Sequence, residues 1–376
     1  MSIQRLEETE THQCHYSTNK PYIQCSRTEM ALRGPLLHLF RRQLNIARPN
    51  QTRAHSVAIL GAPFSKGQKR RGVEHGPKAI RDAGLIERLS NLDCSVHDFG
   101  DLSFPHLDKD EPFMQVPFPR TVGRANKLLS NAVDGAVGAG HTCVMLGGDH
   151  SLAIGSVSGH ARQCPDLCLI WVDAHADLNT PETSPSGNLH GQSVAFLLKE
   201  LQDKMPSIPG FSWMKPFLSS SDLVYIGLRD VDPGEHYFLK NLGIQYFTMR
   251  DIDRMGIQRV MEVTLDHLLA RKQRPIHLSF DIDAFDPSLA PATGTPVNGG
   301  LTYREGIYIT EEIHNTGLLS AMDLVEVNPV LGASSEAVEA TAGLAVDVIA
   351  SSLGQSREGA FQGTPSPTED TEQLRL

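Results

Sequence analysis

Ligand-type side chains stand at alternate positions in the stretch Asp173-Ala174-His175-Ala176-Asp177. Residues i, i+2 and i+4 of an extended chain share one face, so the two carboxylates and the imidazole between them can point at one spot. An apolar run over residues 167–172 precedes them and is typical of a short buried strand. The pattern predicts a strand that delivers three candidate metal ligands at its carboxyl end.

Two other apolar runs end in the same kind of residue. Residues 275–280 lead into Asp281 and Asp283, and residues 142–146 lead into Gly147-Gly148-Asp149-His150, whose glycines permit a tight turn. Carboxylates packed side by side without a cation would repel one another and raise each other's pKa. Three such clusters therefore indicate a metal centre, although a single aspartate of this kind is usually solvated or caps a helix.

The donor types restrict both the metal and the reaction. Two histidines among several carboxylates favour manganese, with iron or cobalt as alternatives, over the sulfur- and nitrogen-rich surroundings of zinc. Five or six protein ligands suit two ions that share carboxylates and a water, whose pKa the ions would lower to supply hydroxide near neutral pH. The reaction class is hydrolysis, and a metal storage or structural site is the alternative.

The elements that position these residues alternate along the chain. Strands are expected over residues 57–60, 95–99, 142–146, 167–172, 223–227, 244–247, 276–280 and 321–325. Helices are expected over residues 79–92, 122–137, 194–201, 256–270, 304–315 and 336–353. Such alternation implies a mostly parallel sheet covered by helices, with ligand sites beyond the carboxyl ends of its strands. An open sheet and a closed eight-stranded barrel both satisfy that rule.

Composition bounds the partners. The formal net charge of −10 over 376 residues argues against nucleic acid or an anionic membrane as the main partner. The six cysteines show no paired framework, which fits a reducing compartment. No apolar run approaches the ~20 residues that a membrane span needs.

Both ends of the chain differ in composition from the middle. Residues 1–54 are expected to be a disordered or targeting segment, in which the part from Met30 carries five arginines and no acid, as mitochondrial transit peptides do. We expect matrix localisation if translation from Met30 exposes this signal, and cytoplasmic localisation otherwise. Residues 55–358 are expected to form one domain, and residues 359–376 a disordered acidic tail.

The three ligand motifs also carry a family resemblance. Residues 147–150, 173–177 and 279–283 resemble the signatures of the ureohydrolases, the arginase and agmatinase family, over residues 56–359. Residues 186–191 and 325–329 resemble the arginase branch, its mitochondrial type II members in particular. The resemblance implies an α/β fold: a single three-layer domain with an open, mostly parallel eight-stranded sheet covered by helices. It also implies hydrolysis of L-arginine to L-ornithine and urea, a step of arginine catabolism and the urea cycle.

The resemblance assigns roles by position match. Two Mn²⁺ ions per subunit would bind His150 and Asp177 on one side, His175 and Asp283 on the other, and Asp173 and Asp281 between them. The implied catalytic residues are Asp177, His190 as proton shuttle, and Glu326 as partner of the guanidinium. The implied substrate contacts are Asn179, Ser186, Gly187 and Asn188 for the α-carboxylate, Asp232 and Glu235 for the α-amino group, and Thr295 and Glu326 near the metals.

Three rival functions and two further details complete the expectations. An agmatinase would hold no α-carboxylate, an inactive relative would lack ligands, and a metal-dependent deacetylase would use a single zinc. Ser193 stands where the family commonly has proline, and we expect little effect on the chemistry. Arg357 resembles a residue at the family's trimer interface, so a homotrimer is implied.

Overall fold

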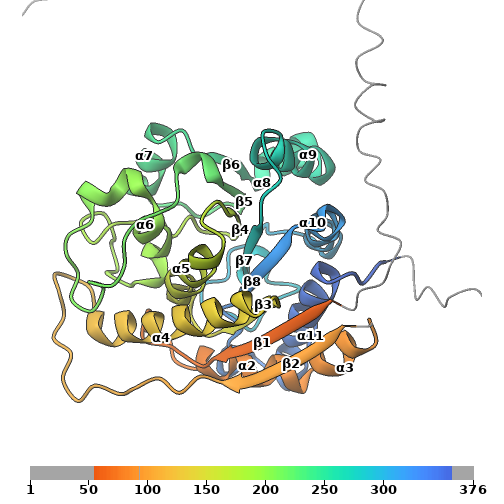
Figure 1. Cartoon of the computed structure of the whole chain (residues 1–376), viewed down its shortest axis with the longest axis horizontal. Coiled ribbons are helices and arrows are strands. Elements are labelled where there is room, and N and C mark those ends of the chain that lie inside the picture. Colours follow the sequence, from red (N-terminus) through yellow and green to blue (C-terminus); the bar gives the residue numbers. More distant parts are fainter. Residues whose placement is uncertain (1–54, 93, 358–376) are drawn as a thin grey trace, which may run out of the picture. The chain divides into compact units, whose positions relative to one another are not determined.

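The centre of the protein is an open, eight-stranded parallel sheet. The structure is a computed structural model and describes residues 55–92 and 94–357. Within these residues the strand order is β2-β1-β3-β8-β7-β4-β5-β6 (Figure 1). The strands are β1 (Ser56–Ala62), β2 (Ser95–Asp101), β3 (Thr142–Gly147), β4 (Cys168–Val172), β5 (Leu223–Leu228), β6 (Gln245–Thr248), β7 (Ile276–Asp281) and β8 (Leu319–Val325). The sheet has free edges at β2 and β6, so the open sheet is confirmed and the barrel is excluded.

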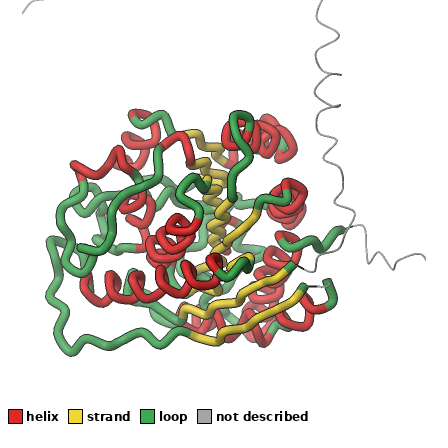
Figure 2. Tube along the Cα trace, in the orientation of Figure 1, coloured by secondary structure: helices red, strands yellow, loops and turns green. Residues whose placement is uncertain are grey.

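Helices cover both faces of the sheet (Figure 2). Buried apolar residues place one set of helices against one face: α2 (Gly76–Asp82), α3 (Leu85–Ser90), α8 (Met249–Met255), α9 (Ile257–Leu269), α10 (Tyr303–Thr316) and α11 (Ser335–Ser352). The other set packs on the opposite face: α4 (Pro119–Gly138), α5 (Ala153–Gln163), α6 (Ser193–Leu197) and α7 (Pro233–Asn241). Successive side chains of each strand point to opposite faces and so contribute to the cores on both sides of the sheet. The three-layer fold is confirmed.

The four central strands end level with one another. Val172 of β4 pairs with Phe280 of β7, Phe280 pairs with Leu324 of β8, and Leu324 pairs with Leu146 of β3. All residues of β4 and β7 are buried, as expected for interior strands of a parallel sheet. The residues that follow these four strands therefore lie close together along the carboxyl edge of the sheet.

The helix expectations were wrong in three respects. The helix expected over residues 194–201 ends at Leu197, because Leu198 is extended and separates α6 from the 3₁₀ helix η4 (Lys199–Lys204). Residues 79–92 do not form one helix, because Gly84 (φ 90°) ends α2 and begins α3. The helices α5, α7 and α8 were not predicted at all. The eight strands were each predicted within a few residues of their observed ends.

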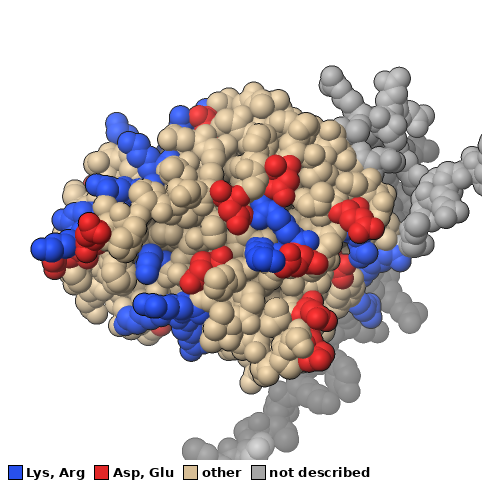
Figure 3. All heavy atoms as spheres, turned by 90° about the horizontal axis from the view of Figure 1, so that it is seen from below, with Lys and Arg blue, Asp and Glu red and all other residues tan. Residues whose placement is uncertain are grey.

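The targeting segment expected over residues 1–54 and the acidic tail expected over residues 359–376 lie outside the described residues. No helix in the described ranges has the length and apolar character that crossing a membrane requires. On the face that Figure 3 shows, acidic and basic side chains lie side by side, and no single sign of charge covers it.

Candidate metal centre

The six predicted metal ligands meet at the carboxyl ends of β3, β7 and β4. His150 opens the short 3₁₀ helix η2 (His150–Leu152) after β3, and Asp281 is the last residue of β7. The turn before His150 requires glycine, because a Cβ at Gly148 would lie 1.8 Å from the carbonyl oxygen of Phe64. Sheet order thus unites residues that are far apart in the chain.

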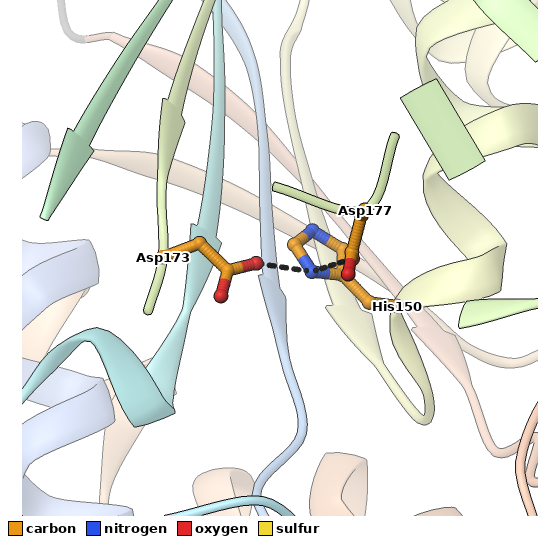
Figure 4. Close-up of side chains that lie close together, drawn as sticks. All are labelled: His150, Asp173 and Asp177. Atoms are coloured by element: carbon orange, nitrogen blue, oxygen red, sulfur yellow. Dashed lines mark ion pairs between the residues drawn. The ribbon is translucent and has the colours of Figure 1, made fainter. Parts of the chain in front are cut away.

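His150 faces three carboxylates. Its Nδ1 lies 3.1 Å from Asp173 Oδ2, 3.2 Å from Asp177 Oδ2 and 3.3 Å from Asp281 Oδ2. Figure 4 shows Asp173 and Asp177 approaching this nitrogen from two sides. The nitrogen is buried, and no hydrogen-bond partner among the described residues is aligned with it. A lone pair aimed among carboxylate oxygens is the arrangement that a divalent cation would complete.

His175 forms a second group with the same chemistry. Its Nδ1 lies 3.2 Å from Asp283 Oδ2 and 3.4 Å from Asp173 Oδ1. Asp173 therefore offers one oxygen to each histidine, and the two groups that can hold an ion share it. The backbone N–H of Asp283 donates to Asp281 Oδ1 at 2.8 Å, which keeps that carboxylate beside the pair. The residues fit two neighbouring ions.

The pKa values of Asp177, Asp281 and His150 are all raised, which indicates that the site favours added positive charge. Burial, and then the charge of Asp173, raise the pKa of Asp177 to about 6. Burial, and then Asp283 and Asp173, raise the pKa of Asp281 well above its ordinary value. Burial alone would lower the pKa of His150, but contacts with the three carboxylates raise it. The pKa values of Asp177 and Asp281 are raised because burial and the charges of neighbouring carboxylates disfavour their ionised forms, which divalent cations would stabilise.

Glu326 and His190 lie in contact beside the ligands. His190 Nδ1 is 3.2 Å from Glu326 Oε1, and the backbone N–H of His150 donates to the same oxygen at 2.9 Å. Burial lowers the pKa of His190, but Glu326 raises it to a net value of about 9.

Glu326 (φ 64°) and Asp177 (φ 48°) both have left-handed backbones, a conformation that costs non-glycine residues about 1–3 kcal/mol.

The residues expected at the α-amino end are held by the start of α7. Asp232 caps this helix, and its Oδ2 accepts from Asn179 Nδ2 at 2.9 Å. Glu235 accepts from the backbone N–H groups of Leu178 and Asp232, both at 2.9 Å. Burial raises the pKa of Glu235 to about 8. Asn179, which the position match assigned to the α-carboxylate, is thus connected to Asp232 and Glu235.

The loop over residues 180–191 carries three of the remaining candidates, Ser186, Gly187 and Asn188. Ser186 Oγ accepts from the backbone N–H of Asn188 at 3.2 Å, and the buried Asn188 Oδ1 has no hydrogen-bond partner in the part of the chain that the structure describes. Gly187 (φ 71°) packs so closely that a Cβ would lie 2.0 Å from Gln115 O. Thr295, from a different segment, donates to Asp283 Oδ2 at 2.8 Å.

Ser193 is closer to the site than we expected. Its buried hydroxyl lies 3.0 Å from the carbonyl oxygens of both His150 and His190. It therefore ties the loop that carries the expected proton shuttle to the turn that carries a metal ligand.

Three contact residues were missed from sequence. Trp171 Nε1 donates to Asp173 Oδ2 at 3.0 Å, and Ser279 Oγ lies 2.9 Å from His150 Nε2. Asp230 Oδ2 lies 3.6 Å from His175 Nε2. Trp171 and Ser279 each precede a ligand by two residues, so the period of a strand placed them on the ligand's face and could have identified them.

A model described as the arginase family matches residues 55–354. The chain belongs to the arginase family. The family expected from the three motifs is confirmed, and with it the hydrolytic class of enzyme.

Curated relatives extend over nearly the whole chain. "Arginase, non-hepatic 3" of Xenopus laevis is 70% identical over 332 residues, which cover 88% of this chain and 92% of the relative. "Arginase-2, mitochondrial" of Homo sapiens is 64% identical over 347 residues, which cover 91% and 98%. The similarity to type II arginases that the motifs suggested is thus confirmed.

Solved structures share the fold. The native arginase of Bacillus caldovelox superposes with a TM-score of 0.74 at 39% identity, covering 81% of this chain and 99% of that one. Entamoeba histolytica arginase in complex with L-ornithine superposes with a TM-score of 0.71 at 28% identity, covering 80% and 99%.

Proposed function

We propose that this chain hydrolyses the guanidinium group of L-arginine to L-ornithine and urea with two Mn²⁺ ions per subunit. The observation that carries the proposal is the pair of ligand groups sharing Asp173, beside the contact between Glu326 and His190. The relatives named arginases support the substrate. The ornithine complex of the Entamoeba enzyme supports the product.

The two groups of ligands seen in the structure would each hold one of the two ions. His150 and Asp177 would hold one ion, His175 and Asp283 the other, with Asp173 and Asp281 between them. Four carboxylates balance the four positive charges, which avoids a large cost of buried charge. The ions would supply a water of lowered pKa as nucleophile near neutral pH.

Glu326 and His190 would serve the reacting group. A guanidinium is always charged and is a poor electrophile, so it must be held firmly for attack. Glu326 is buried and would hold it by charge-assisted hydrogen bonds. His190 has a side chain 17% exposed and touches Glu326, so it can carry protons between the reacting nitrogen and solvent.

The other end of the substrate would meet the connected polar group. Asn179, Ser186 and Asn188 would bind the α-carboxylate, with Gly187 allowing the loop to turn between the last two. Asp232 and Glu235 would bind the α-amino group. Thr295 would act by orienting Asp283, to which it donates a hydrogen bond.

Urea release from L-arginine and from agmatine, measured side by side with the Mn²⁺-loaded full chain, tests the proposal. We expect release from arginine alone, because agmatine lacks the carboxylate. In Asn179→Ala we expect KM for arginine to rise about tenfold or more, since one hydrogen bond to a charged group is lost, with two Mn²⁺ still bound. Equal release from agmatine would reject the carboxylate contacts. No urea from either substrate with two ions bound would reject the function.

Two further proposals concern the protein in the cell. We propose a homotrimer, and localisation in the mitochondrial matrix, which the names of the type II relatives support. Mitochondrial import of the full chain, measured with and without Met30→Leu, tests whether the transit signal is exposed by initiation at Met30. Equal import of both would show that initiation at Met30 is unnecessary.

A further inference from the structure

A set of buried polar side chains leads from His150 into the interface between the sheet and α5. Ser279 Oγ lies 2.9 Å from His150 Nε2, the ring nitrogen that faces away from the carboxylates. The same hydroxyl lies 3.3 Å from Asp323 Oδ2, and Ser279 and Asp323 are register partners on β7 and β8. His150, a proposed metal ligand, is thus linked by two hydrogen bonds, through Ser279, to the buried carboxylate of Asp323, which lies outside the three ligand motifs.

The set continues beyond Asp323. Its Oδ2 also accepts from Ser156 of α5 at 2.6 Å and contacts His277 Nε2 at 3.1 Å. His277 Nδ1 lies 3.1 Å from His160 Nδ1. His160 Nε2 in turn lies 2.5 Å from Ser320 Oγ, where the set reaches half-buried surroundings. The other members are almost fully buried.

The hydrogen bonds have one consistent direction. A carboxylate only accepts, so Ser156, Ser279 and His277 donate to Asp323. His277 then accepts at Nδ1 from His160. Burial, and then His277, lower the pKa of His160 to about 2, so this ring is neutral and accepts from Ser320 at its other nitrogen. On the metal side, Ser279 has given its proton to Asp323 and must accept from His150 Nε2–H. Every donor leads toward Asp323.

This arrangement is costly if it only fills space. Asp323 is 1% exposed, and its second oxygen, Oδ1, is buried with no hydrogen-bond partner within residues 55–92 and 94–357. Apolar residues of similar volume would pack the interface without burying a charge. The direction of the hydrogen bonds has a consequence at His150. With Nε2 held as the donor, Nδ1 is left unprotonated and oriented toward Asp173, Asp177 and Asp281, as a metal ligand must be.

We propose that Asp323 is a positioning residue for the ion at His150, acting through Ser279 to fix the tautomer and orientation of that imidazole. The inference rests on the proposed metal site and names the buried network that sets its affinity. The carboxylate also places negative charge behind the imidazole, which makes it a stronger ligand.

Mn²⁺ titration of the full-length protein, followed by the electron paramagnetic resonance of free Mn²⁺, tests the proposal. In Asp323→Asn, which keeps the shape and one acceptor oxygen, we expect one of the two affinities to fall about 10–100-fold and the other to stay. Ser279→Ala should weaken the same ion, because it interrupts the link. Thr310→Val is the matched control. It removes a buried hydrogen bond from Thr310 Oγ1 to Ser351 Oγ, 2.8 Å long, on the other face of the sheet.

Melting with and without Mn²⁺ separates positioning from general stability. A positioning role reduces the rise in Tm that Mn²⁺ produces, whereas a purely structural role lowers both melting temperatures equally. Unchanged affinities in folded Asp323→Asn would overturn the proposal. If that variant does not fold, unchanged affinities in Ser279→Ala would overturn it, as would equal weakening in Thr310→Val. A wild-type protein that binds no Mn²⁺ would refute the proposed function itself, and this inference with it.

Discussion

The contact between His190 and Glu326 joins two residues to which the family resemblance assigned separate tasks. Their side chains are 3.2 Å apart, and Glu326 raises the pKa of His190 against the effect of burial. A charged imidazole that returns a proton to solvent would leave a neutral ring still hydrogen-bonded to the carboxylate. If His190 carries protons and Glu326 holds the guanidinium, as proposed, proton transfer and substrate binding are coupled through this contact.

The same pair predicts a pH-dependent stability of the Mn²⁺-free protein. The pKa of His190 in the folded state, about 9, lies above its ordinary 6.5. The protonated ring therefore stabilises the fold fully below pH 6.5, and this contribution is lost as the pH rises through about 9. We expect His190→Asn to lower the free energy of unfolding by on the order of 3 kcal/mol at the acidic end, and much less at the alkaline end.

Urea-induced unfolding of both proteins across that pH range measures the difference. Activity provides an independent check, because loss of the shuttle should lower kcat about 100-fold or more while Mn²⁺ binding stays intact. A stability gap that is constant from pH 6.5 to about 9 would contradict the assignment of the raised pKa to this contact.

The loop over residues 180–191 offers a prediction with its own control. Gly187 has φ 71° and no room for a Cβ beside Gln115 O, whereas a Cβ at Gly191 would meet nothing within 4 Å. We expect Gly187→Ala to displace the loop at a cost of about 1–2 kcal/mol or more and to raise KM for arginine about tenfold. Gly191→Ala should behave as wild type, and both variants should bind two Mn²⁺. A normal KM in Gly187→Ala would exclude the loop from substrate binding.

The strands were predictable because interior strands of a parallel sheet are continuous apolar runs, and the ligands after β4 and β7 because alternate residues of an extended chain share one face. Asp173, His175 and Asp177 needed only that alternation and a preceding apolar run. The contact of His190 with Glu326 was not predictable by this reasoning, since the residues are 136 positions apart and meet only through the order of the strands.

The missed helices have specific causes. The face of α5 that meets the sheet carries Ser156 and His160, which are buried polar residues and interrupt the apolar period. The helices α7 and α8 begin with capping boxes, Asp232 with Glu235 and Thr248 with Asp251. That spacing is a start signal for a helix, and it would have located both.

Assembly can be tested at Arg357, near the end of the described chain. Its guanidinium donates to Glu311 of α10 at 2.6 Å and 3.0 Å, and the side chain is 37% exposed. If this region forms the trimer interface, Arg357→Ala should lower the mass in solution from three chains of 41.2 kDa toward one at low concentration. Arg259→Ala, which removes a surface ion pair with Glu262, is the control. Light scattering measures both, and a trimer unchanged by Arg357→Ala would contradict the assignment.

The order of the strands also determines when the metal can enter. Strands β8 and β7 lie between β3 and β4, so neighbours in the sheet come from distant parts of the chain. A nascent chain that has emerged only as far as Asp177 can pair β3 with β1, but it lacks β8 and β7, which join β3 to β4 in the sheet, and it contains neither Asp281 nor Asp283. Loading therefore follows synthesis. The cations of the compartment in which folding finishes, rather than those surrounding the ribosome, decide which metal the enzyme acquires.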